Sequence, residues 1–75
     1  MSVVTELRQF RKDADISLRA LDKLAGIPYA RICKIENGKV PLIYEDLIRL
    51  CVALNVPDVT RGRWVHALTK GILVS

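Results

Sequence analysis

Side chains that can donate hydrogen bonds are frequent in the segment that follows Gly26. Tyr29, Arg31 and Lys34 each carry donors at helical spacing, and Lys39 adds a positive charge just beyond them. Such side chains suit a partner that is rich in acceptor and phosphate oxygens. The chain shows no nucleophile paired with a base, no glycine-rich phosphate loop and no placed pair of carboxylates. An enzyme is therefore the weakest of the candidate functions.

The charge and composition of the whole chain are compatible with that chemistry. The 75 residues include 12 Lys and Arg against 8 Asp and Glu, which gives a net charge of +4. This charge suits a polyanionic partner without requiring one. Because 51% of the residues are hydrophobic, the chain can fold as one small domain without a metal or a disulfide.

The cysteines and the histidine do not indicate a metal site. Cys33 and Cys51 lie far apart, and the single histidine is His66, so the spacing of metal ligands is absent. We expect two reduced thiols, no metal and no cofactor. The first residues do not resemble a signal peptide, and no apolar run reaches the length of a membrane span. We therefore expect a cytoplasmic protein that has no membrane partner.

Apolar residues recur at helical spacing in five segments, which predicts an all-α bundle of about five short helices. The expected helices cover residues 3–13, 18–25, 28–36, 44–55 and 60–70. The second has an expected buried stripe of Leu18, Leu21, Leu24 and Ala25, and the fourth has the clearest amphipathic pattern, at Leu47, Leu50, Cys51 and Leu54. Residues 71–75 allow a short strand.

Local signals mark the ends of the second and third helices. Ser17 is a good N-cap for the second helix, and Gly26 is expected to end it with a positive φ. Asn37 and Gly38 are a strong stop for the third helix. Two short helices joined at a glycine, the second with basic residues outward, are typical of a helix-turn-helix that enters the DNA major groove. We assign this motif to residues 17–37.

The register of these residues resembles the phage-repressor and Cro-like helix-turn-helix domains, the large bacterial class called XRE. The resemblance covers about Leu7 to Val56, and its most specific part is the run from Ile35 to Lys39, Ile-Glu-Asn-Gly-Lys, at a fixed distance from Gly26. It implies a lambda-repressor-like fold, with residues 1–75 as a single DNA-binding domain. It further implies double-stranded DNA as the partner, and a place beside the nucleoid of a bacterial or phage-infected cell.

The same resemblance implies roles for individual residues. Tyr29, Ala30 and Lys34 match the base-reading positions of a recognition helix at 28–36, and Arg11 and Glu36 match an ion pair that holds this helix to the scaffold. The expected phosphate contacts are Ser17, Leu18, Arg19, Arg31, Lys39 and Tyr44. The alternative for Tyr29 and Ala30 is the surface of a protein-binding helix. For Arg31 the alternatives are a base edge or a charge held only by solvent.

Three residues depart from the usual pattern of this class. Leu18 replaces a usual glutamine, Asp22 replaces a small alanine, and Pro28 replaces the serine or threonine that caps the recognition helix. Proline supplies neither a cap oxygen nor an N–H, so one cap or phosphate contact is missing. The Asp22 carboxylate must face solvent or find a basic partner.

The C-terminal segment, residues 57–75, either closes the core of one chain or forms a seam between two. We expect Trp64 in the core and the last apolar residues at an interface. The candidates for a dimer interface are Val65, Leu68, Ile72, Leu73 and Val74. The resemblance implies a dimeric repressor of phage or plasmid type on a palindromic operator, with half-sites about one helical turn apart. The alternative is an antitoxin, or another protein-interaction regulator, built on the same fold.

Overall fold

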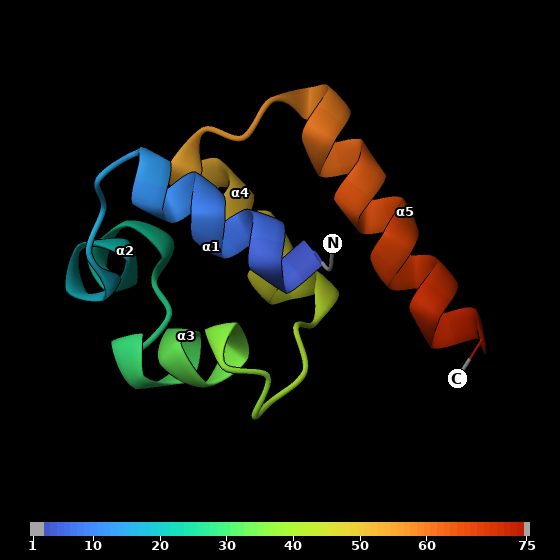
Figure 1. The fold of residues 1–75 in the computed structure, drawn as a ribbon, viewed down its shortest axis with the longest axis horizontal. Helices are drawn as coiled ribbons and strands as arrows, with labels where there is room; N and C mark the ends of the chain where they lie inside the picture. The colour runs from blue at the N-terminus through green and yellow to red at the C-terminus, as the bar shows by residue number, and fades with distance from the viewer. Residues whose placement is uncertain (1–2, 75) are drawn as a thin grey trace.

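The computed structural model describes residues 3–74, with side chains described as far as residue 69. It contains the helices α1 (Val3–Asp13), α2 (Leu18–Ala25), α3 (Tyr29–Glu36), α4 (Tyr44–Leu54) and α5 (Asp58–Val74) (Figure 1). No strand occurs in these residues. The predicted all-α bundle of five helices is confirmed. Among residues 3–74, none of the helices combines the length and the hydropathy needed to cross a lipid bilayer.

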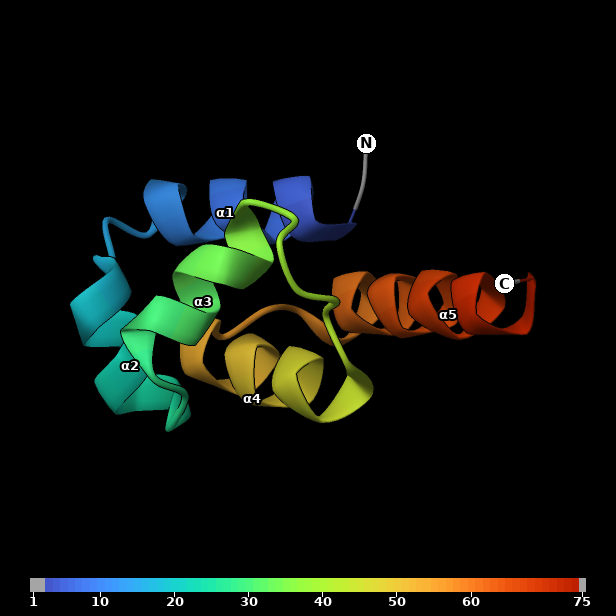
Figure 2. The same ribbon diagram turned by 90° about the horizontal axis from the view of Figure 1, so that it is seen from below.

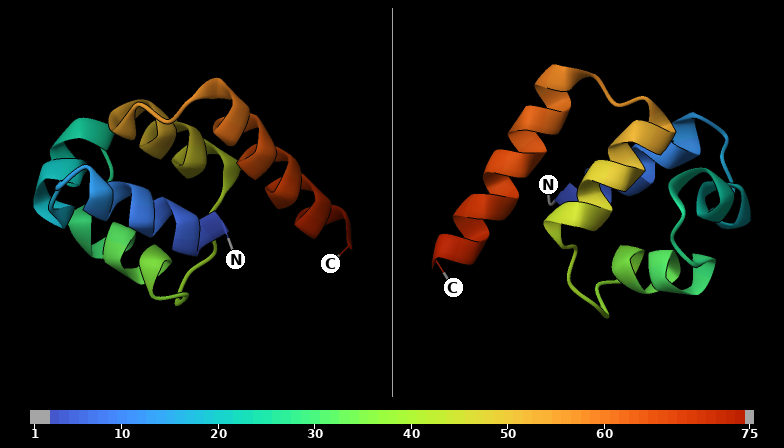
Figure 3. Two further views of the ribbon diagram at one scale, coloured as in Figure 1. Left: turned by 45° about the horizontal axis from the view of Figure 1, so that its top comes forward. Right: turned by 180° about the vertical axis from the view of Figure 1, so that it is seen from behind.

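All five helices contribute side chains to one apolar core. The helical members of this core are Leu7, Leu21, Ala25, Ile32, Ile35, Leu47, Leu50, Cys51, Leu54 and Trp64, and the loops add Ile27, Leu42 and Val56. The amphipathic stripe predicted for α4 is buried along its whole length. α4 packs against both α2 and α5, while α3 packs against α1 and α2. The core therefore fixes α3 on the side of the bundle away from α5 (Figure 3).

The prediction that Leu24 is buried is wrong. Leu24 is 59% exposed, whereas Leu21 and Ala25 in the same helix are 1% and 9% exposed. Because Leu21 and Ala25 lie one turn apart, they form a narrow buried stripe, and Leu24 lies on its flank. The eight residues of α2 therefore bury a narrower face than their composition suggests.

α5 is longer than the sequence pattern predicts. It begins at Asp58 and continues through Gly71 to Val74, so residues 71–74 are helical and do not form the short strand. Ser75 lies outside the described residues. A glycine ends a helix when it adopts a positive φ, as Gly26 does at +71°. Gly71 remains helical, and the last turns of α5 extend past the other helices (Figures 1 and 2).

The two cysteines differ in burial, which predicts different reactivity. Cys51 is buried in α4, and this burial raises the pKa of its thiol, an effect that the positive charge of Arg61 opposes. Cys33 on α3 is partly exposed. Because the thiolate is the reactive form, we expect one thiol to react with an aromatic disulfide reagent in the native protein at pH 8. The second should react only after denaturation. The variant Cys33→Ser should lose the native-state reaction; if that reaction persists, Cys51 is accessible.

Candidate nucleic-acid interface

A cap closes each end of α2, and the cap at Gly26 turns the chain into α3. The Ser17 hydroxyl accepts a hydrogen bond from the Ala20 N–H at 3.1 Å, which confirms Ser17 as the N-cap of α2. At the other end, the N–H of Gly26 donates to the carbonyl of Asp22 at 2.8 Å. Because Gly26 has a φ of +71°, only glycine adopts this turn without strain. The buried Ile27 follows, so the chain enters α3 directly from the turn (Figure 2).

The N-terminus of α3 is capped by α2 and not by its own N-cap residue. Pro28 makes no cap hydrogen bond. Instead, the backbone N–H of Tyr29 donates to Oδ2 of Asp22 at 2.8 Å. Asp22 therefore neither faces solvent alone nor pairs with a basic side chain, the two alternatives that the sequence suggested. Its carboxylate satisfies one of the free N–H groups at the positive end of α3.

Removing this cap should destabilise the fold. We expect Asp22→Ala to lower the free energy of unfolding by about 1 kcal/mol, the typical effect of deleting an acceptor at a helix N-terminus. Urea denaturation followed by circular dichroism would measure the change. Lys23→Ala is the matched control, since Lys23 is an exposed neighbour in α2 and should change stability by less than about 0.5 kcal/mol. Equal losses in the two variants would contradict the capping role.

The outward face of α3 carries the three residues assigned to base reading. Tyr29, Ala30 and Lys34 are all exposed, whereas the isoleucines of α3 face the core. The guanidinium carbon of Arg19 lies 4.8 Å from the centre of the Tyr29 ring, within the range of a cation–π contact. This contact joins the first turn of α2 to the first turn of α3. It holds the Tyr29 ring and keeps the charge of Arg19 beside it.

Apart from Arg31, which lies on α3 itself, the residues assigned to phosphate contacts come from neighbouring segments. Ser17, Lys39 and Tyr44 are exposed, while the side chain of Leu18 packs against the core. For Leu18, the backbone N–H in the first turn of α2 is therefore the group that can meet an anion. These residues begin α2, follow α3 and begin α4.

The C-terminal end of α3 is held to α1 by Arg11 and Glu36, the residues assigned to a scaffold ion pair. Arg11 donates from Nε to Oε2 of Glu36 at 2.7 Å and from Nη2 to Oε1 at 2.9 Å. Its Nη1 donates to the carbonyl of Ile16 at 2.8 Å. The two charged side chains are 12% and 7% exposed. A forked, shielded pair of this kind fixes both position and orientation.

Asp46 binds Arg31 and is a site residue that the sequence pattern does not predict. Arg31 donates from Nε at 3.1 Å and from Nη2 at 2.9 Å, both to Oδ2 of Asp46. Asp46 is buried, whereas the Arg31 side chain remains 44% exposed. The Arg31 side chain therefore has a partner within the protein, and the alternative that only solvent surrounds its charge is wrong. An acidic residue in the first turn of a helix is common, so the sequence contains no signal for this particular partner.

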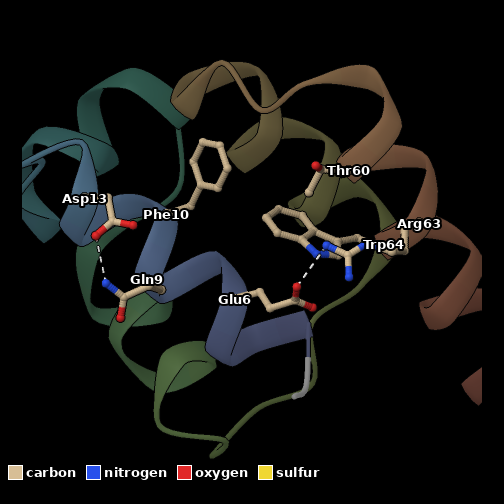
Figure 4. Close-up of a pocket in the computed structure, with 7 residues that line it drawn as sticks. All are labelled: Glu6, Gln9, Phe10, Asp13, Thr60, Arg63 and Trp64. Atoms are coloured by element: carbon tan, nitrogen blue, oxygen red, sulfur yellow. Dashed lines mark hydrogen bonds and ion pairs between the residues drawn. The ribbon is translucent and has the colours of Figure 1, made fainter.

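A pocket lies where α1 and α5 meet. The rings of Phe10 and Trp64 are in edge-to-face contact, with centroids 6.1 Å apart, and Glu6 pairs with Arg63 at 2.9 Å. These residues, with Gln9, Asp13 and Thr60, line an open pocket of about 310 Å³ (Figure 4). Trp64 is 1% exposed and belongs to the core. The pocket therefore lies over the contact between α1 and α5.

The residues assigned to a dimer interface lie along α5. Val65 and Leu68 are partly buried against the core of the same chain. The side chains of Ile72, Leu73 and Val74 lie outside the described part of the structure. Val65 and Leu68 thus pack within their own chain, which reduces the surface area that they can offer to a second copy.

Comparison with known proteins identifies one family. Residues 3–64 match the helix-turn-helix domain, a range that includes α1 to α4 and the part of α5 that carries Trp64. Searches of curated proteins and of solved structures gave no significant match. Since the matched range covers most of the chain and contains the α2–turn–α3 unit described above, this chain belongs to the helix-turn-helix domain family.

Proposed function

We propose that this protein is a sequence-specific DNA-binding regulator of transcription, of the phage-repressor and Cro-like class, with α3 as its recognition helix. The observation that carries the proposal is the way α3 is presented. Its outward residues Tyr29, Ala30 and Lys34 are exposed, while Asp22 and Arg11 hold its two ends. A short helix fixed across another, with donors outward, is the arrangement with which a helix-turn-helix enters the major groove.

The proposed contacts divide into base reading and backbone binding. The Lys34 ammonium can donate to O6 and N7 of guanine, and Ala30 can contact the methyl group of thymine. Ser17 and the free N–H groups that open α2 favour a phosphate because the helix dipole attracts an anion there. Arg19, Lys39 and Tyr44 extend the phosphate-binding surface. The base contacts supply specificity, and the phosphate contacts supply affinity that decreases with salt.

We also propose that two copies bind a palindromic operator and repress transcription by occupying it. The support comes from α5, whose last turns extend past the other helices (Figures 1 and 3). This end of the helix carries the apolar Ile72, Leu73 and Val74 in the sequence. A second copy that packs on it would place two recognition helices on one duplex, as in other dimers of this motif.

A second candidate function is regulation through a protein partner, as in an antitoxin. The observation that favours it is the exposure of large apolar side chains on three helices. Leu24 on α2, Val52 on α4 and Val59 on α5 are 59%, 64% and 85% exposed. Exposed apolar side chains are common singly, so this candidate is second to DNA binding.

Selection of binding sites from a random duplex pool tests the proposal. We expect the wild-type protein to recover an inverted repeat. On the recovered duplex, Lys34→Ala should weaken binding about tenfold or more, because a good base contact is worth about 1–3 kcal/mol. It should also relax the preference at one position of each half-site.

Arg61→Ala is the matched control for this experiment. It removes the same charge, but from α5, where Arg61 pairs with Asp58. We expect it to leave both the recovered motif and the affinity nearly unchanged. If the wild-type pool yields no motif and binding disappears with modest salt, the DNA-reading proposal is wrong and the protein-partner candidate takes its place.

A further inference from the structure

We propose that Arg31 is a specificity-determining residue that reads a guanine, and that Asp46 is the positioning residue that holds it for this task. The inference rests on the proposed function, since it requires α3 to lie in the major groove. It replaces the phosphate contact that the family resemblance implies for Arg31. It also gives a role to a buried carboxylate on α4 that the proposed base-reading residues do not use.

The geometry of the pair leaves one edge of the guanidinium free. A guanidinium carries five N–H donors in a planar fork. Nε and Nη2 of Arg31 both donate to Oδ2 of Asp46, at 3.1 and 2.9 Å, so the side edge of the fork is occupied. The end edge, formed by Nη1 and the second N–H of Nη2, makes no hydrogen bond to any residue that the structure describes. The Arg31 side chain is 44% exposed, so solvent or a ligand can reach this edge.

The free edge matches the acceptors of guanine. O6 and N7 of guanine lie side by side in the major groove, and a bidentate arginine is their commonest specific partner. An unpaired arginine loses side-chain freedom when it binds. Arg31 has already lost much of that freedom, because Asp46 is 7% exposed and belongs to a packed helix. Asp46 thus lowers the entropic cost of a directional contact.

The same pair is poorly suited to bind a phosphate. Phosphate contacts depend mainly on net positive charge, and the Asp46 carboxylate, 2.9 Å from Nη2, offsets the positive charge of Arg31 within the pair. The hydrogen bonds that the free edge can donate to guanine do not depend on a net charge of the pair. Arg31 lies three residues before Lys34 on α3, so the two side chains are neighbours on the helix surface. Arg31 therefore extends the reading face toward α4.

Four variants, measured on the duplex that the wild-type protein selects and on a scrambled duplex, test this assignment. We expect Arg31→Ala and Arg31→Lys each to weaken binding to the selected duplex about tenfold to a hundredfold. Arg31→Lys, which keeps the charge, should change binding to the scrambled duplex less than about twofold, whereas Arg31→Ala also leaves the Asp46 carboxylate unpaired and should weaken it modestly. Lysine keeps the charge but lacks the planar fork of donors, so Arg31→Lys separates base reading from phosphate binding. Repeated site selection with either variant should lose the preference for guanine at one position of each half-site.

Asp46→Asn tests the positioning role. It removes the charge that binds Arg31 and keeps the size of the side chain. We expect a loss of about twofold to tenfold on the selected duplex. In the Arg31→Ala background the same substitution should cause no further loss of binding, because the double-mutant cycle isolates the interaction between Arg31 and Asp46. A similar loss with and without Arg31 would show that Asp46 acts only through the fold, and would overturn its positioning role.

The remaining outcomes separate this inference from the proposed function. If Arg31→Lys keeps the guanine preference, while Arg31→Ala weakens both duplexes alike and lowers the salt dependence, Arg31 contacts phosphate. The inference then fails and the proposed function stands. If the wild-type protein selects no motif at all, the proposed function fails, and the reading role of Arg31 fails with it. The Arg31 variants decide the reading role even if Asp46→Asn does not fold.

Discussion

Arg11→Ala is expected to lower the free energy of unfolding by about 3–5 kcal/mol, the usual loss when one partner is removed from a shielded ion pair. The reason is that Glu36, with only 7% of its side chain exposed, would keep only the longer contact with Arg8 at 3.7 Å. The variant also deletes the donor that satisfies the carbonyl of Ile16. Small domains have a free energy of unfolding of only about 5–15 kcal/mol, so the variant would lose a large part of its stability. Urea denaturation at neutral pH and low temperature would measure it.

Two controls show whether the broken pair between Arg11 and Glu36 causes this loss. The double variant Arg11→Met with Glu36→Gln removes both charges, and we expect it to recover much of the stability, because neutral replacement of a shielded pair is often nearly neutral. Arg8→Ala should cost less than about 1 kcal/mol, since Arg8 is 47% exposed and lies 3.7 Å from Glu36. A loss below about 1 kcal/mol for Arg11→Ala would contradict the ion pair.

Trp64→Ala is expected to cost about 3–5 kcal/mol, the range for truncating a large aromatic residue in a core. Trp64 is 1% exposed and is among the largest fully buried side chains. Its loss also removes the edge-to-face contact with Phe10. Because this contact holds α5 against α1, we expect lower helix content as well as a lower unfolding midpoint. Far-UV circular dichroism measures both, since the variant lacks the only tryptophan.

Trp64→Phe separates packing from hydrogen bonding at this position. The indole Nε1 is buried without a hydrogen-bond partner among the described residues, and such a donor is unfavourable by about 1–3 kcal/mol. Phenylalanine removes this donor and keeps part of the ring, so we expect a net loss below about 1.5 kcal/mol. Val59→Ala, at a position that is 85% exposed, should change stability by less than about 0.5 kcal/mol. If Trp64→Ala behaves like Val59→Ala, Trp64 does not support the core.

The helices could be predicted from the sequence because their signals are local. Apolar residues at helical spacing locate α4, and Ser17 and Gly26 carry the capping preferences that bound α2. The exposure of Leu24 could not be predicted in the same way. Which flank of an eight-residue helix is covered depends on its neighbours and not on its own pattern. The continuation of α5 through Gly71 likewise depends on a φ angle that glycine leaves open.

The candidate site was predictable at the residues whose roles the resemblance implies, and not at the contacts between helices that it does not include. The outward residues of α3 follow from the resemblance, as does the choice of Arg11 and Glu36. The contacts of Asp22 with Tyr29 and of Asp46 with α3 join different helices. Such contacts depend on how the helices pack, and the sequence offered only alternatives for Asp22 and no partner for Asp46.

The anchoring of α3 has a consequence for protein engineering. Its eight residues are bound by side chains from three other helices: Arg11 of α1, Asp22 of α2 and Asp46 of α4. A graft of α3 alone onto another scaffold would leave Glu36 unpaired and the first turn uncapped. A graft that keeps α3 and Arg31 in place and exchanges only Tyr29, Ala30 and Lys34 would preserve all three anchors. The transferable unit of this domain is therefore these three exposed side chains, and the helix that carries them belongs to its own scaffold.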